Sequence, residues 1–147
     1  MKKMLLLALL ACCAVLTAED LLMKNGVKAW SDRNYIVTNL ADSFQFKKAV
    51  PVQKCDGYAI VLPKDTKKAL IAVCASNVAA VDALAKKYNL KPANSEMYIG
   101  DSKRPKILKY AIFIAENPPE KIECKTTNAG GILLALNDDV PAALPAK

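Results

Sequence analysis

The chain has 147 residues, enough for one domain with a hydrophobic core of ordinary size. It contains no histidine, which excludes Ser-His and Cys-His catalysis, a histidine general base and any histidine-ligated metal. The formal net charge of +7 favours anionic partners such as acidic glycans, lipid headgroups or acidic proteins.

The N-terminus has the layout of a secretory signal peptide: a basic start, an apolar run over residues 4–16, and small residues ending at Ala18. We therefore expect residues 1–18 to be a signal peptide and the protein to be secreted or periplasmic. An alternative is that "LLAC" is a lipoprotein box, in which case Cys12 would carry a lipid anchor. Because export removes the usual nucleic-acid targets, we do not expect nucleic acid as a partner.

The first predicted strands follow a turn at Asn25-Gly26 and cover residues 27–30, 35–39 and 44–48. The stretch "VKAWSDRNYIV" spans the first two of them and holds the only tryptophan, Trp30. Strand alternation places Trp30 and Asp32 on one side and Arg33 and Tyr35 on the other. We interpret the stretch as a corner braced by the Asp-Arg pair, with ligand contact through Trp30, Arg33 and Tyr35 as the alternative.

Two apolar runs, residues 58–62 and 69–74, flank a polar turn that contains proline, a pattern typical of a β-hairpin. In that hairpin Cys55 would lie just past the end of the strand that faces Cys74. We therefore predict a disulfide between Cys55 and Cys74, with Cys124 as a buried free thiol. The cysteine spacing contains no Cys-x-x-Cys motif, so neither a zinc site nor a redox motif is expected.

The hydrophobic period then becomes helical over residues 78–88, with Ser76 or Asn77 as the N-cap. A strand is predicted over residues 96–100, a basic loop over 101–106, and a strand apolar on both faces over 107–116. Such a strand belongs at the centre of the core. Further strands are expected over residues 121–127 and 132–136, and residues 138–147 are expected to form a disordered tail.

Many short strands with one helix indicate a mainly-β fold, an antiparallel β-sandwich with one short α-helix, formed by residues 19–137. An α+β open sheet with one packed helix is the alternative fold.

Several of these features resemble small accessory β-sandwich domains of secreted, often carbohydrate-active, bacterial proteins. The residues that match their aromatic-Asp-Arg-x-Tyr opening are Trp30, Asp32, Arg33 and Tyr35, and those that match a later aliphatic strand are Ile71, Ala72 and Val73. Cys74-Ala75 stands where those domains usually have aspartate, and their Pro-x-Trp-Leu segment is absent. The resemblance implies export, a β-sandwich and a non-catalytic role.

The most concentrated basic residues after the signal sequence are Lys103, Arg104 and Lys106, with Lys109 nearby. Asp138-Asp139 and Ser102-Lys103 are the most suggestive catalytic neighbours, but ordinary solvation explains them. We therefore predict a binding module rather than an enzyme, without metal or cofactor, whose partner is an anionic glycan or an envelope protein. The alternative is a structural or assembly protein of the cell envelope that uses an open sheet edge or the helix over residues 78–88.

Overall fold

The computed structural model describes residues 21–141, apart from residues 31–32, 46, 50–58 and 125–129. The predicted signal peptide, the lipid-anchor candidate Cys12 and the predicted disulfide partner Cys55 lie outside this part of the chain.

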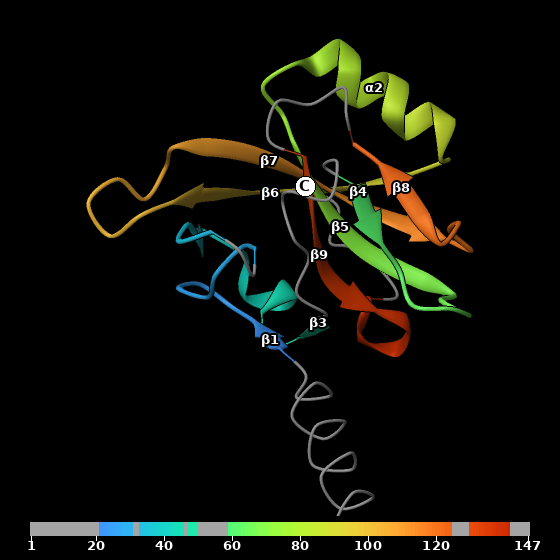
Figure 1. The fold of residues 1–147 in the computed structure, drawn as a ribbon, viewed down its shortest axis with the longest axis horizontal. Coiled ribbons are helices and arrows are strands. Elements are labelled where there is room, and N and C mark those ends of the chain that lie inside the picture. The colour runs from blue at the N-terminus through green and yellow to red at the C-terminus, as the bar shows by residue number, and fades with distance from the viewer. Residues whose placement is uncertain (1–20, 31–32, 46, 50–58, 125–129, 142–147) are drawn as a thin grey trace, which may run out of the picture.

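Within the described residues the fold consists of strands, one α-helix and two short 3-10 helices (Figure 1). The main sheet has five antiparallel strands in the order β2-β6-β7-β5-β9, and β1-β3 and β4-β8 form two small ribbons. The bounds are β1 Leu21–Met23, β2 Ile36–Thr38, β3 Lys47–Ala49, β4 Ala59–Val61, β5 Lys68–Cys74, β6 Lys91–Gly100, β7 Leu108–Glu116, β8 Lys121–Glu123, β9 Gly131–Leu136, α2 Val78–Lys87, η1 Asp42–Phe44 and η2 Asn137–Asp139. The prediction of a mainly-β fold with one helix is therefore confirmed.

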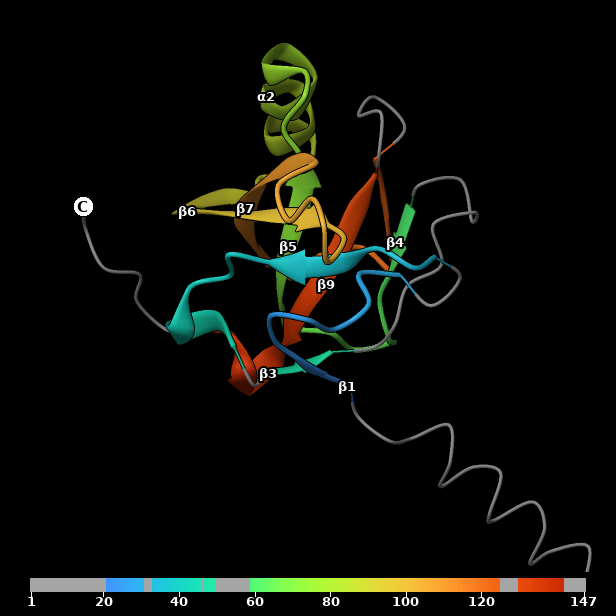
Figure 2. The ribbon, with the colours of Figure 1, turned by 90° about the vertical axis from the view of Figure 1, so that its left-hand side faces the viewer.

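The main sheet carries one hydrophobic core on each face. The N-terminal strands and η1 cover one face, and α2 with the β4-β8 ribbon covers the other (Figures 1 and 2). Alternate residues of β5 supply the two cores: Leu70, Ala72 and Cys74 belong to the first, and Ala69, Ile71 and Val73 to the second. All six are fully buried.

Strand β7 lies in the middle of the main sheet, between β6 and β5. Tyr110 and Ile112 enter the first core, whereas Phe113 and Ala115 enter the second. This confirms the prediction that the doubly apolar strand is central, since only a strand covered on both sides can bury both sets of side chains.

Helix α2 begins and ends close to its predicted bounds. The Asn77 side chain accepts a hydrogen bond from the Ala80 amide at 3.1 Å, so Asn77 is the N-cap. Val81 and Leu84 are buried as the helical period predicts. Val78, the first residue of the helix, belongs to the same face but is 71% exposed.

The predicted hairpin of residues 58–62 with 69–74 does not form. β4 pairs with β8, whereas β5 pairs with β7 and β9 in a different sheet. Cys74 is a buried free cysteine whose thiol lies 3.4 Å from the Ser76 hydroxyl. The prediction of a disulfide between Cys55 and Cys74 is therefore wrong for this structure, because the strand pairing on which it depended is absent.

Strand β6 is longer than the predicted strand and starts at Lys91 rather than at residue 96. Its pairing with β7 is interrupted between Pro92 and Glu96, and Asn94 has a φ of 49°. Proline has no amide hydrogen for the ladder, so a bulge after Pro92 is the expected compensation.

The C-terminal segment is packed further than predicted. Asn137 begins η2, its side-chain oxygen accepts a hydrogen bond from the Lys67 amide at 2.7 Å, and Val140 is buried in the first core. The part of the predicted tail that the structure describes, residues 138–141, thus contributes to the domain.

Candidate functional site

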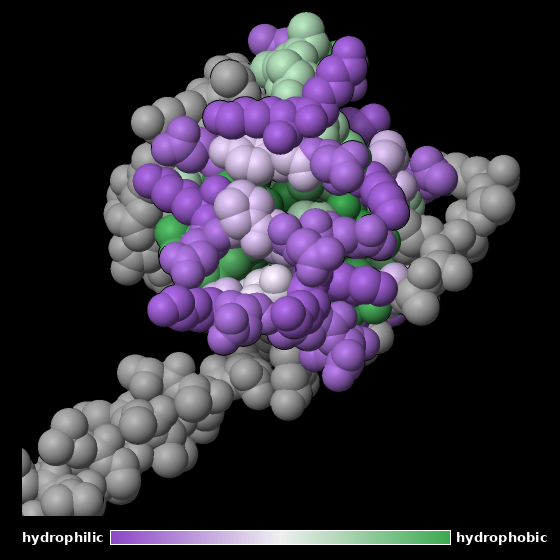
Figure 3. Space-filling model, turned by 90° about the vertical axis from the view of Figure 1, so that its right-hand side faces the viewer, coloured by the Kyte–Doolittle hydropathy of each residue, from purple (hydrophilic) through white to green (hydrophobic). Residues whose placement is uncertain are grey.

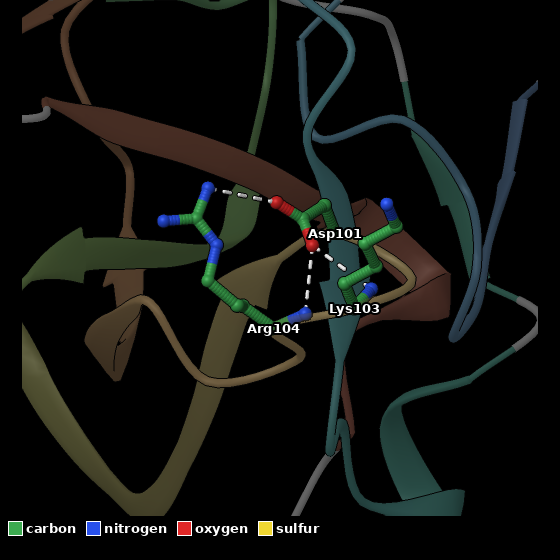
Figure 4. A network of polar contacts seen from close by, with 3 residues as sticks. All are labelled: Asp101, Lys103 and Arg104. Atoms are coloured by element: carbon green, nitrogen blue, oxygen red, sulfur yellow. Dashed lines mark hydrogen bonds and ion pairs between the residues drawn. The ribbon is translucent and has the colours of Figure 1, made fainter.

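The predicted basic loop is a compact turn over residues 101–107, called here the basic turn, which joins β6 to β7. Asp101 organises it: its Oδ1 accepts hydrogen bonds from the Lys103 amide at 2.9 Å and the Arg104 amide at 2.7 Å (Figure 4). The Arg104 guanidinium also lies 3.2 Å from Oδ2 of the same carboxylate. The hydrogen bond from the Arg104 amide is the main reason that the pKa of Asp101 falls below its ordinary value.

Gly100 allows the basic turn to fold back on the sheet. A Cβ at this position would collide with the backbone carbonyls of Arg104 and Pro105. Thr38 of β2 holds the turn from the other side, because its hydroxyl donates a hydrogen bond to the Pro105 carbonyl. The basic turn is therefore built by backbone and short polar side chains, which leaves its long cationic side chains at the surface.

The three predicted basic residues present their charges differently. Lys103 is exposed, and its ammonium makes no ion pair with the residues that the structure describes. Arg104 is paired with Asp101 but its side chain is still 73% exposed. The Lys106 ammonium lies over the ring of Tyr98, 5.0 Å from the ring centroid. The turn therefore offers one unpaired and two partly engaged cations.

The stretch predicted as a corner is a tight chain reversal. The Gly26 amide donates to the Val37 carbonyl at 2.8 Å, and the Ala29 amide donates to the Tyr35 carbonyl at 2.9 Å. Asp32 lies outside the described residues, so the predicted Asp-Arg brace stays a prediction.

The side chains of this reversal point to different environments. Trp30 is 1% exposed, and its indole N–H donates to the Gly131 carbonyl at 3.4 Å. Tyr35 is 38% exposed and meets Trp30 edge-on, with ring centroids 6.5 Å apart. Arg33 is exposed. The tryptophan face is therefore not accessible for stacking against a ligand, whereas Arg33 and part of Tyr35 are.

The sheet brings Arg33 and Tyr35 to the same end of the molecule as the basic turn. Ile36 of β2 pairs with Gly100 of β6 in antiparallel register. The residues before Ile36 and after Gly100 therefore run out at the same end of the two strands. Figure 2 shows this end from the front, with the basic turn in gold above the cyan strand β2. The register thus places Arg33, Tyr35 and the basic turn toward one end of these two strands, whereas Trp30 is buried in the core.

A second feature is a groove between α2 and the β6–β7 hairpin, called here the helix groove. Two adjoining hollows of about 350 and 280 Å³ share five lining residues. The shared residues are Pro92, Ser95, Glu96, Ala111 and Phe113. Sequence analysis missed this site, because the bulge after Pro92 and the position of α2 over the sheet are tertiary features.

The side of the molecule where β4 and β8 lie has a different character. Hydrophilic side chains cover most of its described surface, and apolar ones show only in the gaps between them (Figure 3). Two surface ion pairs lie on these strands: Lys91 of β6 with Glu116 of β7 at 2.9 Å, and Lys121 with Glu123 within β8 at 3.7 Å. This side is an ordinary solvated surface.

The catalytic candidates do not converge. Glu116 is held by Lys91, whose hydrogen bond lowers the pKa of that carboxyl, and Asp138 and Asp139 lie in η2. Within the described residues no three histidine, cysteine, aspartate or glutamate side chains are grouped as metal ligands. Burial raises the pKa of the Cys124 thiol to about 12, which keeps it protonated at neutral pH.

Comparisons with known protein families, with curated proteins and with solved structures find no match. The resemblance to accessory domains of secreted proteins therefore stays a prediction based on short motifs. In the part of the chain that the structure describes, no helix has the length and apolar character needed to cross a bilayer.

Proposed function

We propose that this protein is an exported, non-catalytic binding module whose ligand is an anionic glycan or another anionic component of the cell envelope. The observation that carries the proposal is the placement of Lys103, Arg104 and Lys106 on one turn organised by the hydrogen bonds of Asp101, with Arg33 toward the same end of the sheet. Asp101 is the one acidic residue in the turn, and two backbone amides and Arg104 already engage it.

The chemistry of this end favours charge recognition over sugar stacking. Trp30 is buried, and one face of the Tyr98 ring is covered by the Lys106 ammonium. Tyr35 is the aromatic ring in this region with substantial exposure. A flat ligand therefore finds little aromatic surface, whereas carboxylate or sulfate groups find several cations within one short turn.

Binding of a sulfated polysaccharide, heparin, and of uncharged dextran tests the proposal. We expect heparin binding that weakens steeply with added salt, and no dextran binding. The double variant K103E/K106E should raise the Kd for heparin by about tenfold, since each substitution replaces an attraction with a repulsion.

The matched control is K64E/K86E, which makes the same charge change at two exposed lysines outside the basic turn. Retention of heparin affinity in K103E/K106E, or an equal loss in both double variants, would show that binding reflects net charge and would overturn the proposed site.

A structural or assembly role is the second candidate. The helix groove favours it, because an apolar hollow between a helix and a sheet is a common way to receive part of another protein.

A further inference from the structure

The helix groove combines an apolar floor with an acidic rim. Val78 and Val81 of α2 line the larger hollow together with Ala111 and Phe113 of β7, and Val78 is 71% exposed. Figure 1 shows why it is open: the β6–β7 hairpin extends beyond α2, so the helix covers only part of this face of the sheet.

Asp82 gives the groove an unpaired negative charge. It lines the hollow, and its carboxylate makes no hydrogen bond or ion pair with the described residues. The other two charges of the lining, Glu96 and Lys109, neutralise each other at 2.6 Å. A chain with a net charge of +7 thus has a locally negative groove.

The basic turn has the complementary character. Ile107 is 37% exposed and is one of the four large apolar side chains that the described residues expose, together with Tyr35, Val61 and Val78. Lys103, four positions earlier in the same turn, makes no ion pair with any residue in the described part of the chain. A turn that carries both an exposed apolar side chain and a cation without an ion pair among the described residues matches a groove lined by apolar side chains and the Asp82 carboxylate.

We propose that the basic turn of one copy of this protein docks in the helix groove of a second copy, with Ile107 against Val78 and Lys103 beside Asp82. This goes beyond the proposed function, because it requires no glycan. The contact joins two different surfaces of the same chain, so it is heterologous, and copies add head to tail into a ring or an open chain.

Sedimentation velocity of the protein in its natural processed form, over a concentration series and without ligand, tests the proposal. We expect the average mass to rise above that of one copy as concentration increases, and the rise to diminish at high salt. D82K and K103E should each shift the association to about tenfold higher concentration, because each places like charges together. The double variant D82K/K103E reverses both charges and should restore association.

Restoration by the double variant separates a direct contact from a loss of folding, since two damaging substitutions would otherwise add. The control D138K makes the same charge change at an exposed carboxylate outside the groove and should associate as the original chain does. A mass of one copy at all concentrations, or a double variant weaker than either single one, would overturn the proposal. Heparin binding measured below the association range is independent of this result, so failure of one proposal leaves the other standing.

Discussion

Trp30 and Tyr35 lie five positions apart and share a ring contact, yet they serve different environments. The indole is enclosed in the first core and donates to the Gly131 carbonyl of β9, so it ties the N-terminal reversal to the far edge of the main sheet. Tyr35 caps this arrangement from outside. One ring of this aromatic pair is therefore part of the core, and the other is partly accessible at the surface. Strand alternation alone does not reveal this difference.

Asp101 is the residue on which the basic turn depends. Its pKa is lowered by the Arg104 amide and by further hydrogen bonds, so the folded turn favours the ionised carboxylate. A carboxyl group with a lowered pKa stabilises the fold above its ordinary pKa of 3.8, and that stabilisation disappears as pH falls through the lowered value. We expect D101A to lower the Tm at pH 7, with a difference from the original chain that diminishes in acid.

Thermal unfolding followed by circular dichroism between pH 7 and pH 2 measures this effect. The control D101N keeps a side-chain oxygen for the two amides but loses the charge, so its Tm at pH 7 should lie between those of the original chain and D101A. Equal Tm values for D101A and the original chain at pH 7 would contradict the role assigned to Asp101.

At the scale of single elements, α2 is held by its cap and by two buried side chains, Val81 and Leu84. Asn77 satisfies the Ala80 amide, which has no partner inside the helix. We expect N77A to reduce the free energy of unfolding by about 1 kcal/mol, because alanine cannot accept that hydrogen bond. Urea unfolding at pH 7 measures the change.

The control for the cap is N77D, because aspartate is an N-cap residue of similar strength and its charge suits the helix N-terminus. Its stability should equal or exceed that of the original chain. If N77D loses as much stability as N77A, the asparagine at this position acts through something other than the cap.

Elements whose pattern is local could be predicted from the sequence. The helical period over residues 78–88 and the doubly apolar run of β7 both describe how one segment is covered, and both predictions are confirmed. The choice of partner strand is not local. β4 and β5 look like neighbours because a short polar turn joins them, but β4 pairs with β8, and β5 lies between β7 and β9.

The same limit applies to the candidate site. The cluster of Lys103, Arg104 and Lys106 is visible in the sequence because the residues lie within four positions, and the structure places them in the turn between β6 and β7. The placement of Arg33 toward the same end of the sheet depends on the β2–β6 register, and the helix groove depends on a bulge opposite β7. Neither follows from the pattern of one segment.

For the molecule as a whole, the two cores share the main sheet. Local opening of the sheet's interior strands therefore exposes the most apolar surface and costs the most free energy. β5 and β7 are paired on both edges and covered on both faces. We expect their backbone amides to exchange with solvent most slowly of all, and those of α2 and the basic turn to exchange faster. Native-state hydrogen exchange read by NMR measures this order. Faster exchange in β5 than in α2 would show that the sheet isn't the most stable unit.

The burial of β5 on every side has a consequence for synthesis. Residues 69–74 have no charge and high β-propensity, and the final partner strand, β9, is made near the end of the chain. Because β7 is made earlier, a polypeptide that emerges N-terminus first can pair one edge of this segment, but the edge that pairs with β9 must stay unpaired until nearly the whole chain has been translated. Lys67 and Lys68 immediately precede this segment, where gatekeeper charges discourage premature aggregation. Newly made chains should accordingly depend on a chaperone that shields this segment while they wait.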